Sequence, residues 1–312
     1  DKALSRRFEV INVDEPTKEE TRDILLKVKR EYELHHNVII SNNIVNKIIE
    51  YANKYIPFKQ NPDKSIDFLD SVCSKVKYDN NSYELIRSIN NKKNNLLTLK
   101  DQYFKVNKYE EVLKLYKEEI RLNKQLNKYN NKKVFITEKD IINTVISKLK
   151  IPFNINNFSN NEEINNIIIN KFKNKESFIK LLIKGNAIDN LKKISANISK
   201  NVNIFDLSEY KNIYDVNKLL KEFNRINTNI FNIYIFNNYD KCISNIKSII
   251  KDILNNKKII DNSDNYIYFN NALIFVIDNS KESLIGFDQS NKKEDNLTFD
   301  KVIYINEKVL DF

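Results

Sequence analysis

The sequence predicts an α/β protein with a large helical portion. Through the first half of the chain, apolar side chains recur at intervals of three and four residues, which is the spacing of one face of an α-helix. The second half contains short apolar runs separated by polar stretches, at residues 178–183, 202–207, 231–236 and 272–277. Such runs are typical of strands buried on both faces of a parallel sheet, so we expect a sheet there with helices between its strands.

Length and composition limit the classes of protein to which the chain could belong. The chain has 312 residues, 41% of them hydrophobic, and can therefore bury one or two sizeable cores. No apolar run is long enough to cross a bilayer and no signal peptide is recognisable, so we expect a soluble protein without a membrane partner. The lack of methionine and the start at Asp1 favour a portion of a longer polypeptide. Cys73 and Cys242 lack metal-ligand spacing, so we expect ordinary thiols and no metal site.

The basic charge of the chain raises a nucleic-acid alternative. The formal net charge is +10 and the pI is about 9.2, and clustered Lys and Arg would release counterions from a phosphate backbone. Here, however, the lysines are scattered among abundant Asn and Ile, a bias expected from an AT-rich coding sequence. A basic nucleic-acid-binding protein is therefore kept as an alternative, recognisable by an affinity that falls steeply with salt.

Three amphipathic segments predict a small helical bundle over residues 15–80. Thr17 and Glu20 have the spacing of a capping box and predict a helix over residues 17–34. A second helical face follows, and a third begins after Pro62. The three faces consist of Ile24, Leu25, Val28 and Tyr32; then Ile44, Val45, Ile48, Ile49, Ala52 and Tyr55; then Ile66, Leu69, Cys73 and Val76.

Between residues 81 and 133 the pattern becomes that of a short coiled coil. Alternating three- and four-residue intervals separate Val106, Tyr109, Leu113, Tyr116 and Ile120 in a Lys- and Glu-rich background. An ordinary amphipathic hairpin packed on the bundle is the alternative, and periodicity does not separate the two. A further helix is predicted to open at residues 137–140 and to end before Pro152.

Several segments of the first half resemble, in order and spacing, the end of the first AAA+ module of Clp/Hsp100 ATPases. They are residues 1–8 with Arg6 and Arg7, then 15–17, 32–36 with two histidines, 55–56 and 62–70. The resemblance implies that Arg6 and Arg7 are arginine fingers, which reach the nucleotide of a neighbouring subunit and stabilise charge on the transferring phosphoryl group. A plain pair of surface arginines in salt bridges is the alternative. It also implies that Pro62, Asp63 and Lys64 lie on the adenine side of the lid, with a plain helix-start lysine as the alternative. The histidine pair matches a structural pair in the family.

The resemblance continues through the second half, where the residues that bind phosphate have been replaced. Residues 177–196 are similar to the family's strand, P-loop and helix, but Gly185 and Gly286 are the only glycines in the chain. Gly185 is retained, whereas Leu182 stands at the first glycine, Ile188 at the lysine and Asp189 at the threonine. An apolar group and a carboxylate at these positions oppose the binding of a polyanion.

The other catalytic positions of the second module are similarly altered. Residues 233–242 are similar to the Walker B strand, with Asn237 and Asn238 at the magnesium-binding Asp and the water-activating Glu. Amides neither carry charge for a metal nor act as a general base. Asn279 falls on the sensor asparagine, which is retained, and Thr298 falls on the second arginine finger, where a hydroxyl cannot replace a guanidinium. No Gly-Tyr-Val-Gly-like pore segment lies between residues 220 and 233.

The resemblance therefore implies three parts. Residues 1–80 would be the end and helical lid of a first AAA+ module, 81–133 a short coiled-coil middle domain of ClpC type, and 134–312 a linker helix with a degenerate P-loop-type α/β AAA+ core. The function implied is that of part of a Clp/Hsp100 chaperone ATPase subunit, whose second module does not hydrolyse ATP and acts in ring assembly or regulation. The enzyme-class alternative is an ATP-dependent protein unfoldase of a Clp protease, active through an upstream first module.

The partners and cofactors follow from the same resemblance. We expect other Clp ATPase subunits in a homo- or hetero-hexamer, and unfolded protein clients. ATP and Mg²⁺ would serve the intact assembly, with none in the second module. A Clp peptidase is a further candidate, although residues 284–287, which carry letters like the family's docking tripeptide, fall instead in the segment after the sensor strand. The Asn, Lys and Ile bias resembles that of a gene from a reduced plastid genome, such as an apicoplast.

Overall fold

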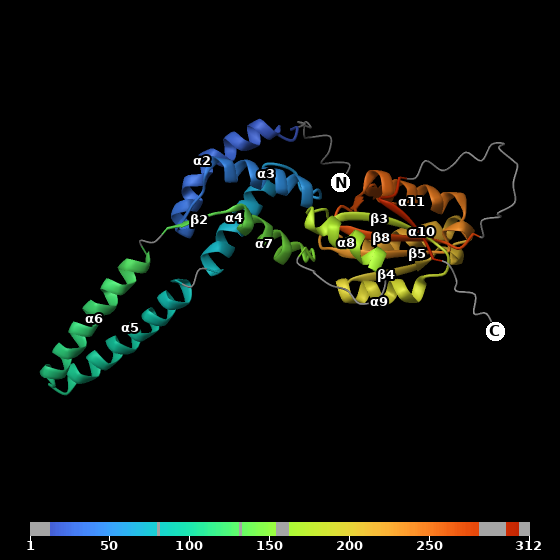
Figure 1. Cartoon of the computed structure of the whole chain (residues 1–312). Helices are drawn as coiled ribbons and strands as arrows, with labels where there is room; N and C mark the ends of the chain where they lie inside the picture. Colours follow the sequence, from blue (N-terminus) through green and yellow to red (C-terminus); the bar gives the residue numbers. More distant parts are fainter. Residues whose placement is uncertain (1–12, 80–81, 131–132, 154–161, 281–297, 306–312) are drawn as a thin grey trace, which may run out of the picture. The chain divides into compact units, whose positions relative to one another are not determined.

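The computed structural model describes residues 13–79, 82–130, 133–153, 162–280 and 298–305 (Figure 1). The chain divides into two compact units, Asp1–Asn53 with Lys59–Thr144 and Lys54–Phe58 with Val145–Phe312. Arg6, Arg7 and Gly286 lie outside the described residues. Among the residues described, no helix is long and apolar enough to cross a membrane, and no group of three or more His, Cys, Asp or Glu side chains is placed to hold a metal ion.

The first unit is helical, as the sequence predicted. Its elements are α2 (Lys18–His36), β1 (Val38–Ile39), α3 (Asn42–Tyr55), α4 (Asp63–Asp79), α5 (Ser82–Lys105), α6 (Tyr109–Asn130), β2 (Val134–Phe135) and α7 (Glu138–Leu149), of which α3 and α7 run on into the second unit. Thr17 caps α2 by accepting the Glu20 N–H at 3.2 Å, while the Glu20 carboxylate accepts the Thr17 N–H at 2.8 Å. Two short parallel strands, β1 and β2, add an element that periodicity did not predict.

Helices α5 and α6 pack on each other as a hairpin over the residues for which a short coiled coil was predicted, but the core of the hairpin differs from the predicted seam. The buried side chains are Ile89 and Leu96 from α5 and Leu122 and Leu126 from α6. The five positions assigned to the seam are all exposed, with fractions of 60% for Val106, 56% for Tyr109, 62% for Leu113, 50% for Tyr116 and 40% for Ile120. Helix α6 carries two apolar faces, and the one with the more regular spacing is not the one that packs on α5.

The second unit is built on a five-stranded parallel sheet in the order β4-β5-β8-β3-β9. Its strands are β3 (Phe178–Lys184), β4 (Val202–Asp206), β5 (Asn232–Asn237), β8 (Ala272–Asp278) and β9 (Lys301–Tyr304). Its helices are α8 (Glu162–Lys173), α9 (Ile188–Ile198), α10 (Ile213–Arg225) and α11 (Ser244–Asn256), with a separate antiparallel pair, β6 (Lys258–Ile260) and β7 (Tyr266–Tyr268). The four predicted apolar runs are β3, β4, β5 and β8, and the mixed α/β class is confirmed.

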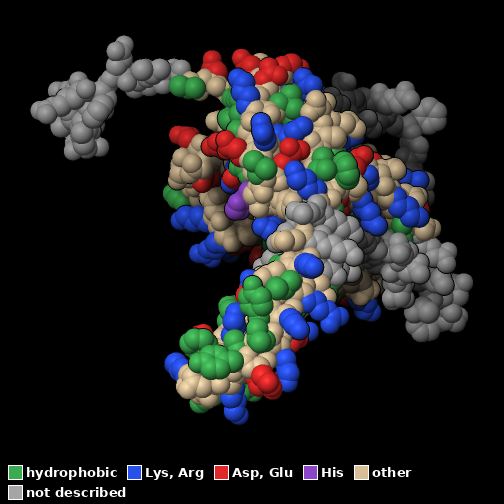
Figure 2. Space-filling view, turned by 90° about the vertical axis from the view of Figure 1, so that its left-hand side faces the viewer, with side chains coloured by type: hydrophobic (Ala, Val, Ile, Leu, Met, Phe, Trp, Pro, Cys, Tyr) green, Lys and Arg blue, Asp and Glu red, His purple; other side chains and the backbone are tan. Residues whose placement is uncertain are grey.

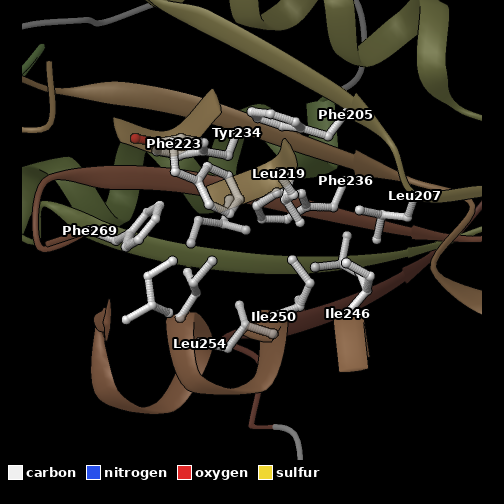
Figure 3. Close-up of a cluster of buried hydrophobic side chains, with 14 of the residues drawn as sticks. Phe205, Leu207, Leu219, Phe223, Tyr234, Phe236, Ile246, Ile250, Leu254 and Phe269 are labelled. Atoms are coloured by element: carbon white, nitrogen blue, oxygen red, sulfur yellow. The ribbon is translucent and has the colours of Figure 1, made fainter. Parts of the chain in front are cut away.

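The core of the second unit lies between the sheet and helices α10 and α11 (Figure 3). Strands β5 and β8 are almost entirely buried, because they occupy the middle of the sheet and are covered on both faces. Phe223 of α10 makes edge-to-face or tilted contacts with Phe205, Phe236 and Phe269, with ring centroids 5.1–6.2 Å apart. This packing holds the strands in position, and therefore also positions the residues at their carboxyl ends.

Candidate functional site

The carboxyl ends of the parallel strands bring most of the predicted second-module residues to one edge of the sheet. Lys184 at the end of β3 pairs in register with Asp278 at the end of β8, and Asp206 at the end of β4 pairs with Asn237 at the end of β5. Ligands of open α/β sheets bind outside this edge. The side chains at the positions that the resemblance assigns to a degenerate nucleotide site can therefore be compared with what ATP and Mg²⁺ require.

In the segment that resembles a P-loop, residues 182–189, the first three residues belong to strand β3. Leu182 lies within β3, where it pairs with Val276 of β8 and Val302 of β9. Three residues, 185–187, separate β3 from α9. A P-loop wraps an anion with successive free N–H groups, whereas here the strand occupies the first half of the motif.

Gly185 is held by the sheet. Its N–H donates to the Asp278 carbonyl at 3.0 Å. Its φ is +105°, and a Cβ at this position would lie 2.6 Å from the carbonyl oxygen of Ile305. The neighbouring Lys184 carbonyl accepts the N–H of Ile305 at 2.9 Å. The retained glycine is thus required by a close backbone approach within this unit.

The start of α9 carries a carboxylate where a nucleotide would place phosphate. Ile188 is the first residue of α9, and Asp189 follows in the first turn with its side chain 83% exposed, 3.5 Å from Lys192. The N-terminus of a helix attracts anions because its N–H groups are unpaired and its dipole is positive there. A carboxylate at this end already uses that attraction and repels a second anion.

Lys184, the cation at the end of β3, is paired with a carboxylate. Its Nζ lies 2.5 Å from Oδ2 of Asp278, and the two side chains are 23% and 14% exposed. Burial by itself would raise the pKa of Asp278, but hydrogen bonds from Lys184 and from the Ser280 N–H hold that pKa below its ordinary value. The charge of Lys184, which directly precedes Gly185, is therefore neutralised by this chain's own aspartate.

Asn238 and Asn279, which the resemblance assigns to Walker B and sensor positions, form a hydrogen-bonded chain with two aspartates. Nδ2 of Asn238 donates to Oδ1 of Asp206 at 2.8 Å, and Nδ2 of Asn279 donates to Oδ1 of Asn238 at 3.0 Å. The Asn279 N–H in turn donates to Oδ1 of Asp240 at 3.1 Å. Asn237 lies at the end of β5 beside them. The structure thus brings Asn238 and Asn279 together and ties them to β4 through Asp206.

Asp206, like Lys184 and Asp278, lies at this edge without having been predicted from the sequence. Its carboxylate also accepts the hydroxyl of Ser208 at 2.6 Å. Burial alone would raise the pKa of Asp206, but hydrogen bonds from Asn238 and Ser208 keep it below its ordinary value. A polar residue at the end of an apolar strand was the available signal, since the ends of parallel strands lie at one edge of the sheet.

Together these residues do not fit ATP and Mg²⁺. Carboxylates are present at the edge, but Asp278 is paired with Lys184 and Asp206 accepts from Asn238 and Ser208. No described residue at the motif positions supplies the lysine or hydroxyl that a P-loop needs, because Ile188 and Asp189 stand there. Asn237 and Asn238 supply neither the charge for a metal nor a base for water.

Thr298, at the second arginine-finger position, is bound within this unit. Its hydroxyl oxygen accepts a hydrogen bond from Nζ of Lys180 at 2.9 Å, and the same Nζ donates to the Leu254 carbonyl at 2.9 Å. Burial lowers the pKa of Lys180, because an ammonium loses hydration there. The segment at residues 298–300 thus serves to join β3 to the end of α11.

The candidate lid residues lie in the first unit. Pro62 precedes α4, Asp63 is its first residue, and Lys64 is 7% exposed. Nζ of Lys64 lies 3.1 Å from Oε1 of Glu15, which also accepts the Asn61 N–H at 2.6 Å. The Asn61 N–H and Lys64 both lower the pKa of Glu15. Lys64 therefore anchors the segment before α2 to the start of α4.

The histidine pair is part of the same helical unit. His36 is 6% exposed, and its Nε2 lies 2.9 Å from Oδ1 of Asp70 in α4. Its ring stacks against Tyr32 with centroids 6.2 Å apart. These contacts join α2 to α4, in line with the structural role that the resemblance implied.

Sequence comparisons identify a family model and named relatives that are similar to this chain. An AAA lid domain model matches residues 17–133, which contain α2 to α6. The ClpA homolog of Guillardia theta, described as an ATP-dependent Clp protease ATP-binding subunit, is 30% identical over 175 residues, 53% of this chain and 21% of that protein. The ClpC subunit of Staphylococcus aureus is 29% identical over 177 residues, with the same coverage. The chaperone ClpB of Rickettsia conorii is 46% identical over 77 residues, 25% of this chain and 9% of that protein.

Solved structures extend the similarity to most of the chain. A closed-state reconstruction of Hsp104 with ATPγS and casein has a TM-score of 0.61 at 16% identity, covering 89% of this chain and 47% of that one. The extended S. cerevisiae Hsp104–casein complex has a TM-score of 0.60 at 17% identity. At these identities the likeness concerns the fold, and the chain spans less than half the length of the relatives it matches. The lid match, the named relatives and the shared fold support the assignment of this chain to the Clp/Hsp100 AAA+ ATPases.

Proposed function

We propose that this chain is part of a Clp/Hsp100 chaperone ATPase subunit whose second module does not hydrolyse ATP and acts in ring assembly or regulation. The observation that carries the proposal is the replacement of nucleotide contacts by internal ones at the carboxyl edge of the sheet. Lys184 bonds to Asp278, and Asp206, Asn238 and Asn279 bond to one another. These bonds hold the ends of four neighbouring strands without a ligand.

The energy of the Lys184–Asp278 pair supports the exclusion of nucleotide. For Lys184 to bind phosphate, Asp278 would lose its partner while 14% exposed. Removing one partner of a buried ion pair costs on the order of 3–5 kcal/mol. A phosphate at the start of α9 would in addition meet the Asp189 carboxylate. Nucleotide binding would thus have to offset an unpaired charge and a like-charge contact before gaining any affinity.

We further propose that Arg6 and Arg7 act in trans on the first-module site of a neighbouring subunit. The support is the resemblance of residues 1–8 to the family's arginine-finger segment, together with the AAA lid match that begins at residue 17. In this proposal ATP and Mg²⁺ serve the first module, the assembly is a homo- or hetero-hexamer, and unfolded proteins are its clients. An ATP-dependent unfoldase active through that first module is the second candidate, favoured by the same lid match.

We also propose a ClpC-type subunit located in a plastid-type organelle. The similarity to the Staphylococcus aureus ClpC subunit and the short two-helix hairpin support the subtype. The Asn, Lys and Ile bias of the sequence supports the organelle. A Clp peptidase is a candidate partner, because two relatives are described as ATP-binding subunits of the Clp protease.

Titration of the chain with a fluorescent ATP analogue and Mg²⁺ tests the pseudo-ATPase proposal. We expect no saturable binding by the unmodified chain, and none by an Ile188→Lys/Asp189→Thr variant, because the Lys184–Asp278 pair and the strand at Leu182 remain. Magnesium-dependent binding in the micromolar range by the unmodified chain would overturn the proposal.

A further inference from the structure

Three basic side chains gather along the outer surface of α10. Lys218, Lys221 and Arg225 follow one another at intervals of three and four residues, so they lie on one side of the helix, and all three are exposed. The opposite side carries Leu219 and Phe223, which pack in the core. On the face of the molecule shown in Figure 2, by contrast, Lys and Arg side chains are interspersed with Asp and Glu. The fold thus collects three of the basic residues that are scattered in the sequence, and we call these three residues the basic stripe.

The charge of the basic stripe is not neutralised by the chain's own carboxylates. Within the part of the chain that the structure describes, no carboxylate forms an ion pair with any of the three side chains. The two acidic residues of α10 have other partners. Asp215 accepts the Asn212 N–H at 3.1 Å, and Glu222 accepts the Tyr210 hydroxyl at 2.9 Å. The stripe therefore presents three positive charges to solvent, where they attract an anionic partner.

An exposed aromatic ring lies at the amino-terminal end of the stripe. Tyr214 precedes Lys218 by four residues, so it lies on the same side of α10, and it is 80% exposed. From Tyr214 to Arg225 the helix rises about 16 Å at 1.5 Å per residue. Single-stranded nucleic acid is held by this combination of groups, because cations contact its phosphates while its bases stack on aromatic rings.

Two more aromatic rings lie on the β6–β7 pair, whose turn contacts the other end of α10. Nδ2 of Asn224 donates to Oδ2 of Asp261 in that turn at 3.0 Å. Tyr266, which is 51% exposed, and Tyr268 are neighbours on the pair, with ring centroids 6.1 Å apart. Nζ of Lys258 lies 4.4 Å from the centroid of the Tyr266 ring. A second group of rings beside a cation thus adjoins the carboxyl end of α10.

We propose that the basic stripe and Tyr214, extended by the tyrosines of β6–β7, bind a single strand of nucleic acid. Phosphates would pair with the stripe, and bases would stack on the tyrosine rings. An acidic polypeptide would use the cations but would leave the rings without bases to stack on them, so the rings favour nucleic acid. The proposal goes beyond the proposed role in ring assembly and does not depend on it.

Titration of the full chain with a fluorescein-labelled oligo(dT) of about twelve nucleotides tests the proposal. Fluorescence anisotropy should show saturable binding in the micromolar range at about 50 mM salt. Three phosphate contacts on a single strand predict a slope of about −2 for log K against log salt, since each contact contributes about −0.7. The affinity should therefore fall roughly twentyfold between about 50 mM and about 200 mM salt.

Charge variants assign the phosphate contacts to the stripe. Lys218→Gln/Lys221→Gln should make the salt slope shallower by about 1.4, because two contacts are lost. The matched control is Lys192→Gln/Lys193→Gln, which removes the same net charge from exposed positions of α9 and should leave the slope unchanged. Circular dichroism checks that each variant keeps its secondary structure.

Aromatic variants test the stacking. Tyr214→Ala should weaken binding of the single strand at least about fivefold, and Tyr214→Phe, which keeps the ring, should bind as the wild type does. Tyr304→Ala is the control, because Tyr304 is 61% exposed in β9, away from α10. A duplex of oligo(dT) with oligo(dA) has its bases already stacked on one another, so Tyr214→Ala should not change its affinity.

Four results would overturn the proposal. The first is the absence of saturable oligo(dT) binding at about 50 mM salt. The second is an equal salt slope for the stripe variant and the α9 control. The third is an unchanged affinity of Tyr214→Ala for the single strand, which would make the stripe a site for any polyanion. The fourth is displacement of the probe by polyglutamate as effectively as by unlabelled oligo(dT), which would assign the stripe to an acidic polypeptide.

Discussion

Breaking the Lys184–Asp278 pair should destabilise the second unit by an amount that the structure sets. Lys184→Met leaves Asp278 as an unpaired carboxylate that is 14% exposed. Loss of one partner of a buried pair costs about 3–5 kcal/mol, and the partial exposure of Lys184, at 23%, places the expected value near the lower end, about 3 kcal/mol. At about 2–4 °C per kcal/mol for a domain of this size, the Tm should fall by roughly 6–12 °C.

The double variant shows whether the loss arises from the pair. In Lys184→Met/Asp278→Leu neither charge remains, so most of the loss should be recovered, and the double-mutant cycle should give a coupling free energy of about 2 kcal/mol or more. Lys192→Met is the matched control, since its 3.5 Å pair with Asp189 has side chains 49% and 83% exposed and should contribute less than about 1 kcal/mol. Urea unfolding followed by circular dichroism measures each free energy of unfolding. A coupling free energy below about 0.5 kcal/mol would refute the reasoning.

Three further predictions concern single groups. Gly185→Ala should destabilise the second unit by at least about 2 kcal/mol in urea unfolding, because the new Cβ would lie 2.6 Å from the Ile305 carbonyl oxygen and the backbone φ is +105°. An unchanged urea midpoint would show that the backbone at Ile305 moves away without cost. The pKa of Asp278 is lower in the folded chain than in the unfolded one, so its contribution to the free energy of unfolding is complete above the ordinary aspartate pKa and is lost as pH falls through the folded-state pKa. The free energy of unfolding of the wild type should therefore drop more between pH 5 and pH 2 than that of Asp278→Asn. Parallel curves for the two proteins would contradict this. Burial raises the pKa of the Cys73 thiol to about 12, so a thiol reagent at pH 8 should modify Cys73 only at the rate of unfolding. Fast labelling of Cys73 in the native chain would contradict this by showing that the thiol is accessible.

The strands of the second unit could be predicted because each is a short apolar run between polar segments, and the runs at 178–183, 202–207, 231–236 and 272–277 correspond to β3, β4, β5 and β8. Strands β5 and β8 are buried on both faces, whereas β4 lies at the edge of the sheet with Ile204 45% exposed. Helix α2 was equally well defined, because Thr17 and Glu20 form a local hydrogen-bonded motif that needs no tertiary contact.

The hairpin core could not be predicted, because α6 has two apolar faces and periodicity treats them alike. Leu122 and Leu126 pack on α5, whereas Leu113 and Ile120 remain exposed. Which face of α6 is buried depends on how α5 packs against it, and this packing is a tertiary property. The local pattern therefore identified a helix and a seam but assigned the seam to the wrong face.

The sequence predicted where the candidate site lies in the fold, but only some of the residues that form it. Asn238 and Asn279 could be placed by resemblance, and their 3.0 Å contact follows from the convergence of β5 and β8. The Lys184–Asp278 pair depends on the register of β3 against β8, residues that lie far apart in sequence. The same applies to Asp206, whose partner Asn238 follows a different strand. Local periodicity shows which residues form a strand, but it does not show which residues of a distant strand lie beside them.

Hydrogen exchange of residues 178–198 with and without millimolar Mg-ATP is the most direct test of a nucleotide-free second module. A ligand that binds the native state stabilises it by about 2.7 kcal/mol at a concentration 100-fold above its Kd, which would slow exchange in the segment it contacts. We predict identical exchange of β3 and α9 in both conditions, because Lys184, Gly185 and Asp189 are already engaged by the chain's own groups. Slower exchange of this segment with Mg-ATP would show that nucleotide binds there and would contradict the account.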